Sequence, residues 1–289
     1  MNIEELSLLH PCFARGEKNA KGRIHLPVSP GCNIECRFCK RDFNDTEQVP
    51  GVASSLLTPE EAVEAVGRAK EVCPDITVAG IAGPGDTLAT NFALDTFELI
   101  KKEHPAMVKC MSTNGLMLPD RAERILEVGI DSLTVTVNAV DPEIEAKINA
   151  GISYRGKHYE GVEAAEILIR NQLEGIRRVS EGGVTVKVNT VLIPDINGDH
   201  IEEVAKTVSE AGAKLYNIIP LIPRHELASY PPPTCQQIDG ARQRAEKYIE
   251  VFRHCMRCRA DAVGILGGED IGEQIYLKRI QGEMPFSHG

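Results

Sequence analysis

The sequence predicts an α/β fold in which a parallel sheet is covered by helices. Between about residues 24 and 221, short runs rich in β-branched residues alternate with longer segments of helical period. Glycines and polar residues gather where those runs end. Alternating strands and helices are typical of connected βαβ units, whose strands lie parallel. The chain has 289 residues, which is ample for the buried core of one large domain or two modest ones.

Six strands are predicted, at residues 24–29, 76–82, 107–112, 132–138, 184–191 and 214–221. Five helices are predicted between them, at residues 59–72, 91–104, 119–128, 161–180 and 200–211. Thr58 and Pro59, with Glu61 close behind, form a clear helix start, because threonine caps a helix and proline suits its first position. One further helix is predicted after the proline-rich residues 230–233, at about 234–252. Six such strands can curl into an open partial barrel or form a flat doubly wound sheet, and periodicity does not choose between them.

Composition excludes several classes of protein. Lys and Arg total 32 against 42 Asp and Glu, a net charge of −10, which argues against a nucleic-acid binder that tracks phosphates. No window approaches the roughly 18 uninterrupted apolar residues of a membrane span, and the N-terminus lacks the shape of a signal peptide. We therefore expect a cytoplasmic protein with no nucleic-acid or membrane partner. In that reducing compartment, nine cysteines favour metal or redox roles over a disulfide framework.

Polar residues follow the predicted strands at the ends where a site is expected. The segment SPGCNIECRFCK follows the first strand, AGPGD the second, STNG the third and PLIPR the sixth. Asn138 ends the fourth strand and Asn189 lies near the end of the fifth. In both candidate architectures the carboxyl ends of parallel strands face a common opening. We therefore place the functional site there.

Cys32, Cys36 and Cys39 form a C-x3-C-x2-C motif directly after the first strand. A structural zinc site requires four ligands. Iron–sulfur clusters are also usually held by four thiolates, so three thiolates leave one iron open to a substrate. With Phe38 just before the third cysteine, these residues resemble the signature of the radical S-adenosylmethionine superfamily.

This resemblance implies a TIM-like partial (β/α)6 barrel and a 4Fe-4S cluster bound by Cys32, Cys36 and Cys39. The open iron of that cluster would chelate the amino and carboxylate groups of S-adenosylmethionine and cleave it reductively to a 5′-deoxyadenosyl radical. In the superfamily a glycine-rich loop after the second strand receives the methionine amino group. The further residues expected to bind S-adenosylmethionine are Phe38, Gly83, Gly85, Asp86, Ser112, Asn114, Asn138 and Asn189.

Five more residues are candidate metal ligands. Cys110 precedes Ser112 by two residues, so both side chains project to the same side of a strand, toward the barrel interior. Taken separately, Cys12, Cys110 and His25 favour core packing, because free cysteine packs as a small hydrophobe. The C-x2-C pair of Cys255 and Cys258 indicates a metal half-site. Cys73 and Cys235 are assigned to packing or to the surface, and the charges of Lys109 and of the arginines around the C-x2-C pair either balance a metal cluster or are solvated.

Nearly the whole chain resembles the NifB family of nitrogenase cofactor maturases. The matching segments are HPC at 10–12, the cysteine motif at 32–39, PGV near Gly51, GIAGPGD at 80–86, STNGL at 112–116, YRGK-x-Y at 154–159, QLEG at 172–175, VKVN at 186–189 and RHC-x2-CRADAVG at 253–264. Many family members carry a C-terminal domain related to small cofactor-carrier proteins. This chain ends soon after RADAVG and resembles the short, stand-alone form.

The family resemblance implies that two further 4Fe-4S clusters are substrates. They would be coupled, with a carbon derived from S-adenosylmethionine and a sulfur, into an eight-iron carbide-centred precursor of the nitrogenase cofactor. Cys12, His25 and Cys110 would hold one cluster, and Cys255 and Cys258 the other, with Cys12 able to serve either. Fewer than four ligands suit a substrate that must rearrange and leave.

The resemblance also implies an organisation and a set of partners. We expect one structural unit with an N-terminal extension carrying a cluster ligand (1–23), a partial barrel (24–229) and a tail carrying the C-x2-C motif (230–289). The expected partners are an iron–sulfur cluster donor, an electron donor and a cofactor carrier or scaffold protein. Two alternatives remain: a different radical S-adenosylmethionine enzyme with permanent auxiliary clusters, and a non-catalytic iron–sulfur scaffold.

Overall fold

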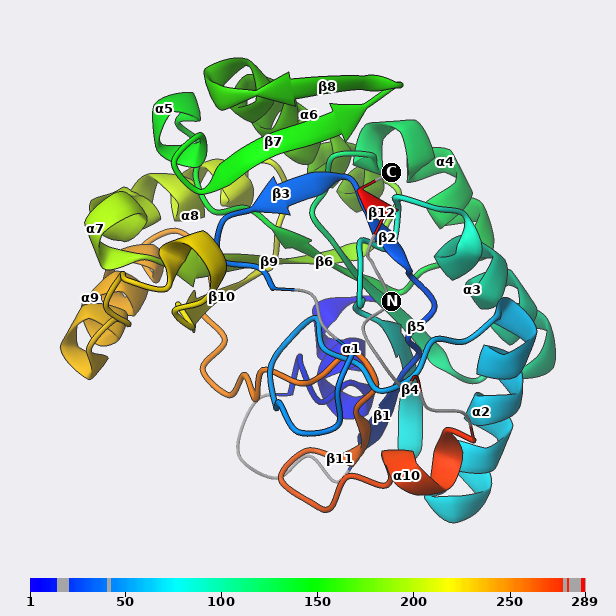
Figure 1. Cartoon of the computed structure of the whole chain (residues 1–289). Coiled ribbons are helices and arrows are strands. Elements are labelled where there is room, and N and C mark those ends of the chain that lie inside the picture. The colour runs from blue at the N-terminus through cyan, green and yellow to red at the C-terminus, as the bar shows by residue number, and fades with distance from the viewer. Residues whose placement is uncertain (15–20, 41–42, 278–279, 281–286, 289) are drawn as a thin grey trace.

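The computed structural model describes residues 1–14, 21–40, 43–277, 280 and 287–288 (Figure 1). Its centre is a curled seven-stranded sheet whose strands neighbour one another in the order β10-β9-β6-β5-β4-β1-β11. These strands are β1 (Gly22–His25), β4 (Ile76–Ile81), β5 (Val108–Thr113), β6 (Ser132–Thr136), β9 (Thr185–Leu192), β10 (Leu215–Pro220) and β11 (Val263–Ile265).

Strand order decides between the two predicted architectures. The six strands from β1 to β10 are parallel, and each neighbours the next one of the set along the chain. A doubly wound sheet reverses its order at a switch point, which this sheet does not do. Right-handed crossovers that advance in one direction put all their helices on one face. The sheet is therefore a partial (β/α)6 barrel, as the family resemblance predicted.

Five of the helices that cover the outside of the curled sheet lie between its strands along the chain (Figure 1). They are α2 (Pro59–Val72), α3 (Phe92–Glu103), α4 (Leu118–Val128), α6 (Gly161–Glu181) and α8 (Ile201–Glu210). Each lies within two residues of its predicted range, and so do β4, β5, β6, β9 and β10. Helix α2 begins as predicted, because the Thr58 side chain accepts from the Glu61 N–H and the Glu61 side chain accepts from the Thr58 N–H.

Two predicted ranges were wrong. Strand β1 begins two residues earlier than predicted and ends at His25 instead of residue 29. Its start is set by antiparallel pairing of Gly22 with Ile265 in β11, and Pro27 has no N–H with which to continue the ladder. The tail helix α9 (Cys235–Ala245) stops well before residue 252.

The end of α9 is set by a backbone pairing that competes with the helix. The Phe252 N–H donates to the Tyr216 carbonyl at 2.7 Å, and the Tyr216 N–H donates to the Glu250 carbonyl at 2.9 Å. The chain after α9 therefore runs extended beside β10. This pairing brings the residues before Cys255 up to the sheet.

The remaining elements were not predicted, because they are short or pair with distant segments. They are α1 (Ile3–Leu9), β2 (Gly31–Cys32), β3 (Ile34–Cys36), α5 (Pro142–Glu145), β7 (Asn149–Tyr154), β8 (Lys157–Glu160), α7 (Pro194–Asn197), η1 (Gly198–His200), η2 (His225–Leu227), α10 (Gly272–Ile275) and β12 (Ser287–His288). A three-stranded sheet of β3, β7 and β8 holds part of the cysteine motif, and β12 pairs with β2. No helix in the described ranges is long and apolar enough to cross a membrane.

Helix α1 closes the amino end of the barrel. Thr77 Oγ1, near the start of β4, donates to the Leu9 carbonyl at 2.6 Å, and Thr185 Oγ1, at the start of β9, donates to the Met1 carbonyl at 2.8 Å. Leu6 and Phe13 pack in one apolar cluster with Val78, Val108, Leu215 and Phe252. The opening toward the site therefore lies at the carboxyl ends of the strands.

Candidate metal centre

A cavity of about 320 Å³ lies inside the curl of the sheet. Strand residues two apart line it in pairs, Cys110 with Ser112 on β5 and Lys187 with Asn189 on β9, as alternation along a strand requires. Nine of the predicted site residues line this one cavity: Cys12, His25, Phe38, Cys39, Cys110, Ser112, Asn189, Cys255 and Cys258. The N-terminal extension, the barrel strands, the cysteine loop and the tail thus all contribute donors to one site.

The cysteine motif lies at the carboxyl edge of the sheet. Cys32 ends β2, Cys36 ends β3, and the Cys39 N–H donates to the Cys36 carbonyl at 3.0 Å. Cys39 lines the cavity, whereas Cys32 and Cys36 are half-buried against an apolar cluster around Ile34. Across the described ranges, no three His, Cys, Asp or Glu side chains could hold one metal ion. The loop supplies three thiols, the donor type that iron–sulfur clusters use.

The glycine turn 83–86 is bound to the start of the cysteine loop. The Gly85 N–H donates to the Ser29 carbonyl at 2.7 Å, and the Asp86 N–H donates to the Gly31 carbonyl at 2.8 Å. A Cβ on Gly85 would lie 1.9 Å from the Gly31 carbonyl oxygen, so only glycine allows this approach. Gly83 and Gly85 do not line the cavity. Their contact with S-adenosylmethionine stays a prediction.

Asp86 and Asn114 join the ends of β4 and β5. The buried Asp86 carboxylate accepts from the Asn114 N–H at 2.6 Å and from Thr113 Oγ1 at 3.0 Å, and burial raises its pKa. Asn114 Nδ2 donates to Asn33 Oδ1 at 2.7 Å and lies 3.9 Å from Cys32 Sγ. Both side chains hold the scaffold around the cysteine motif rather than line the cavity.

The two predicted asparagines at the ends of β6 and β9 differ in position. Asn138 is buried, and its Oδ1 accepts from the Val191 N–H at 3.0 Å. Its backbone carbonyl accepts from Asn197 Nδ2 at 2.9 Å. Asn189 lines the cavity, and its Oδ1 accepts from Asn217 Nδ2 at 3.0 Å. Asn138 therefore fixes the strand ends, while Asn189 faces the site.

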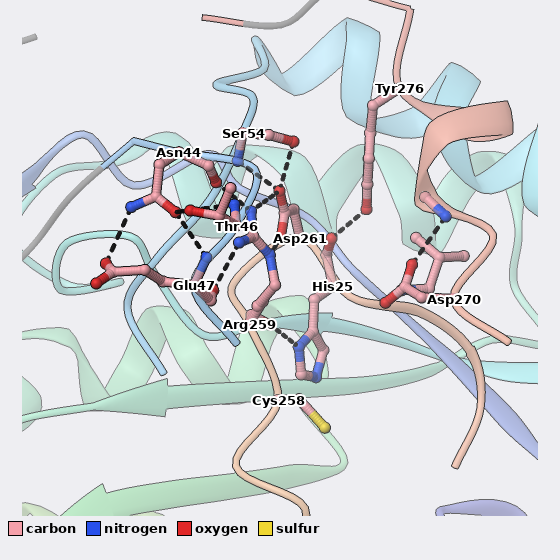
Figure 2. A network of polar contacts seen from close by, with 12 residues as sticks. His25, Asn44, Thr46, Glu47, Ser54, Cys258, Arg259, Asp261, Asp270 and Tyr276 are labelled. Atoms are coloured by element: carbon pink, nitrogen blue, oxygen red, sulfur yellow. Dashed lines mark hydrogen bonds and ion pairs between the residues drawn. The ribbon is translucent and has the colours of Figure 1, made fainter. Parts of the chain in front are cut away.

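The His25 ring is held in one tautomer. Its Nδ1 lies 2.8 Å from the Arg259 carbonyl (Figure 2), which only accepts, so Nδ1 holds the proton and Nε2 keeps its lone pair. Burial and the charge of Arg23 lower the pKa of His25 to about 4, although the bond to Arg259 opposes the shift. Gly80 makes room for the ring, because a Cβ there would lie 3.0 Å from His25 Cδ2. A neutral imidazole with a fixed tautomer is typical of a metal-binding histidine.

The tail is held by a buried ion pair (Figure 2). Arg259 donates from Nε to Asp261 at 2.8 Å and from its Nη atoms to the Glu47 and Asn44 carbonyls, each at 2.7 Å. Burial acts to raise the pKa of Asp261, but hydrogen bonds from Arg259 and Ser54 hold it below its ordinary value. The Arg259 side chain thus braces the loop 44–54 instead of facing the cavity.

Comparison with known proteins identifies the family. The sequence model of the radical SAM superfamily matches residues 26–208. A protein of Methanocaldococcus jannaschii named FeMo cofactor biosynthesis protein NifB is 41% identical over 276 residues, which cover 95% of this chain and 92% of that protein. The chain belongs to the NifB family. A NifB of Klebsiella pneumoniae is 44% identical over 281 residues, and the match covers 94% of this chain but 60% of that longer protein.

The fold agrees with this membership in the radical SAM superfamily. The crystal structure of Streptococcus suis SuiB superposes with a TM-score of 0.57 at 10% identity, over 79% of this chain and 49% of that one. At that identity the similarity concerns the fold alone. The NifB family membership therefore rests on the sequence matches.

Burial controls the protonation of the two thiols on the closed side of this NifB cavity. It raises the pKa of Cys12 to about 11, with Lys187 acting in the opposite direction, and it raises the pKa of Cys110 as well. Both thiols hold their protons near neutral pH, and a metal that bound them would displace those protons. Cys258 is half-buried and accepts from Arg23 Nη2 at 3.4 Å, whereas Cys255 is exposed.

Three charged or polar residues of the site were missed from the sequence: His10, Arg23 and Lys187. Lys187 is buried and lines the cavity, and its signal was its spacing of two from Asn189 in the predicted strand. Lys109, considered from the sequence as a counter-charge, lies on the other face of β5 and pairs with Asp131 at 3.6 Å. Neither remaining cysteine lines the cavity, because Cys73 packs against the main core and Cys235 is exposed at the start of α9.

Proposed function

We propose that this chain acts in FeMo cofactor biosynthesis as a radical S-adenosylmethionine maturase. It couples two 4Fe-4S substrate clusters and adds a carbide from S-adenosylmethionine and a sulfur, giving the eight-iron precursor of the nitrogenase cofactor. Two relatives that span nearly the whole chain carry the name FeMo cofactor biosynthesis protein NifB. The structural observation that carries the proposal is that five candidate cluster ligands from four distant segments line one cavity.

The resident cofactor is a 4Fe-4S cluster held by Cys32, Cys36 and Cys39. The donor set fits this group, because three thiols lie in one loop at the carboxyl edge of the sheet. With S-adenosylmethionine bound, the cluster supplies the one-electron and methyl-transfer chemistry. Ser112 and Asn189 line the cavity and bind S-adenosylmethionine there, while Phe38 covers the apolar side next to Cys39.

The scaffold around the cysteine loop orients these groups. Asp86 and Asn114 hold the carboxyl ends of β4 and β5 together, and Gly85 lies against Gly31 at the base of the loop. Gly83 and Asn138 complete the strand ends that face S-adenosylmethionine. Loops anchored in this way keep a binding geometry that a free loop would lose.

The substrate clusters occupy the rest of the cavity. Cys12, His25 and Cys110 bind one cluster, with His25 contributing Nε2 and the two thiols losing their protons. Cys255 and Cys258 bind the other, and Arg23 stabilises the Cys258 thiolate by a charge-assisted hydrogen bond. Neither set reaches four donors, so each cluster keeps open corners for coupling and release.

The proposal requires partners that the chain does not supply itself. An iron–sulfur cluster donor must load the two substrate clusters, and an electron donor must reduce the resident one. A carrier or scaffold protein must accept the eight-iron product. Because Cys255 is exposed while Cys12 is half-buried behind α1, the tail side of the cavity is the side that such partners reach.

The test removes the tail ligands and leaves the rest of the site. The variant Cys255→Ala/Cys258→Ala, loaded anaerobically, should contain about four irons fewer per chain than the unaltered protein. It should still form 5′-deoxyadenosine from S-adenosylmethionine but yield no eight-iron product. Cys73→Ala, at the end of α2 and outside the cavity, is the control and should match the unaltered protein.

Three results would contradict the proposal. An unchanged product yield in the double variant would remove the tail from the site. Iron that stays on the unaltered chain after turnover would instead favour a radical S-adenosylmethionine enzyme with permanent auxiliary clusters. Absence of 5′-deoxyadenosine from the fully loaded protein would favour a non-catalytic scaffold.

A further inference from the structure

His10 presents an unused hydrogen-bond donor to the cavity. Its Nδ1 accepts the Cys12 backbone N–H at 3.1 Å, so Nδ1 carries no proton and the ring proton is on Nε2. The residue is only 2% exposed, and in the described part of the chain Nε2 has no hydrogen-bond partner. A buried donor without an acceptor is costly, which indicates that a ligand supplies one.

Lys187 presents a second unused donor to the same cavity. The residue is 6% exposed, and its Nζ lies 5.2 Å from the centroid of the Phe13 ring and 5.5 Å from that of Phe252. Among the described residues no carboxylate pairs with it, in contrast to Lys109 with Asp131 on the outer face of β5. A buried ammonium held between two aromatic rings keeps its charge uncompensated until an anion arrives.

Phe13 brings the two donors together. Its ring packs edge-on against His10 with centroids 4.9 Å apart, and the same ring lies under the Lys187 ammonium. Both donors line the cavity with the three candidate ligands Cys12, His25 and Cys110. The two hydrogen-bond donors and the three candidate ligands thus lie on the same wall of the cavity, at the end of the barrel that α1 closes.

The two histidines hold opposite tautomers. The His25 ring donates from Nδ1 to the Arg259 carbonyl, so its Nε2 offers a lone pair to a metal. The His10 ring accepts at Nδ1, so its Nε2 offers a proton instead. One histidine is therefore suited to bind iron and the other to bind an atom that accepts hydrogen bonds.

We propose that His10 Nε2–H and Lys187 Nζ bind the sulfides of the substrate cluster that Cys12, His25 and Cys110 ligate. This inference rests on the proposed function. A cluster with thiolate ligands and bridging sulfides is an anion whose sulfurs accept hydrogen bonds. Hydrogen bonds to these sulfurs and the charge around them both set the reduction potential of the cluster. The two N–H donors bind the sulfides and occupy no coordination position on iron. They therefore hold the cluster while leaving its irons free to react.

The test isolates that cluster in the full-length chain. The background variant replaces Cys32, Cys36, Cys39, Cys255 and Cys258 by alanine, so that Cys12, His25 and Cys110 are the proposed cluster ligands that remain in the cavity. It is reconstituted anaerobically with ferrous iron and sulfide, without S-adenosylmethionine, and titrated with dithionite under electron paramagnetic resonance. A background that binds no iron contradicts the proposed function and this inference together.

Removing the buried charge should make the cluster harder to reduce, because reduction adds an electron that the Lys187 ammonium stabilises. We expect Lys187→Met to lower the ratio of reduced to oxidised cluster at least tenfold at fixed potential, or 59 mV for a one-electron couple. Lys187→Arg should restore the ratio. Lys109→Met is the matched control on the outer face of the sheet. An effect of Lys187→Met no larger than that of Lys109→Met overturns the inference and leaves the proposed function standing.

A second measurement covers the case in which Lys187→Met does not fold. Proton electron–nuclear double resonance in H2O and D2O detects exchangeable protons close to a paramagnetic cluster. The reconstituted background should show one such proton that His10→Phe removes and His10→Gln, which places an amide N–H near the position of Nε2, restores. An identical set of exchangeable protons in the background and in His10→Phe overturns the role of His10.

Discussion

Glu145 shows at the scale of one residue how burial changes acid–base behaviour in this chain. It ends the short helix α5, is 1% exposed, and accepts a hydrogen bond from Asn149 Nδ2. Burial raises its pKa to about 7, while the bonds from Asn149 and the Ala139 backbone act in the opposite direction. Asn149 lies opposite Cys36 in the pairing of β7 with β3, so this carboxyl supports the strand behind the cysteine motif.

The raised pKa of Glu145 predicts a stability that falls with pH. The folded protein holds the proton up to about pH 7, whereas the unfolded chain releases it near the ordinary value of 4.5. The stabilisation is thus complete below about pH 4.5 and is lost as pH rises to 7, a loss of about 3 kcal/mol in the free energy of unfolding. Glu145→Gln does not titrate, so between pH 4.5 and 8 its stability should rise by that amount relative to the unaltered protein.

Urea unfolding at several pH values measures this difference. Glu143→Gln, on the exposed side of the same helix, is the control and should follow the unaltered protein at every pH. Parallel stability curves for Glu145→Gln and the unaltered protein would show that the buried carboxyl is not the titrating group.

Individual site residues were predictable where a local pattern fixed them. The spacing of Cys110 and Ser112 placed both on one face of a strand, and both line the cavity. The same rule applied to Lys187 and Asn189, but an isolated lysine in a strand gives no sign of whether it pairs with a carboxylate. The tautomer of His25 depends on a carbonyl 234 positions away, which no local pattern contains.

At the scale of elements, the tail depends on side chains more than on secondary structure. Between α9 and β11 the chain has little regular structure, yet it carries both Cys255 and Cys258. Arg259 ties it to the loop 44–54, and the Tyr276 hydroxyl donates to the His25 carbonyl. The position of the C-x2-C motif therefore rests on the backbone pairing with Tyr216 before it and on the buried Arg259 after it.

Replacing this arginine should loosen the tail. Arg259→Met leaves Asp261 buried without its partner, and removing one member of a buried ion pair destabilises a protein by about 3–5 kcal/mol. We expect a loss of that size in the free energy of unfolding, with faster amide exchange in residues 44–54 and 258–264. Arg253→Met, which removes a more exposed pair with Glu246, should change stability by less than about 1 kcal/mol. Equal effects of the two substitutions would mean that Arg259 does not hold the tail.

Helices and strands were predictable where the residues that fix them lie close together in the sequence. The crossover helices carry their start signals within a few residues, as Thr58 and Glu61 do for α2. Strand β11 is formed because Ile265 meets Gly22 across nearly the whole chain, and α9 is cut short by pairing with Tyr216. The periodicity of the sequence does not predict such long-range backbone pairing.

At the scale of the whole molecule, the cavity connects parts of the chain that are otherwise held separately. Cys12 follows α1, which closes the barrel, Cys110 belongs to the central sheet, and Cys258 belongs to the tail. A cluster bound by Cys12, His25 and Cys110 joins the extension to the sheet, and one bound by the tail cysteines joins the tail to it. Cluster binding and folding are therefore linked, as they are in other metal-dependent folds.

This linkage predicts that the loaded protein melts at a higher temperature than the protein stripped of its clusters. A ligand present at 100 times its dissociation constant stabilises the folded state by about 2.7 kcal/mol. For a chain of this size that corresponds to an increase in Tm of about 4–5 °C for each cluster. Cys12→Ala/Cys110→Ala should lose about a third of the increase, because one of the three clusters is lost, whereas Cys73→Ala should keep all of it. Anaerobic calorimetry before and after chelation measures the shift. Equal melting temperatures of loaded and stripped protein would mean that the clusters bind the folded chain no better than the unfolded chain.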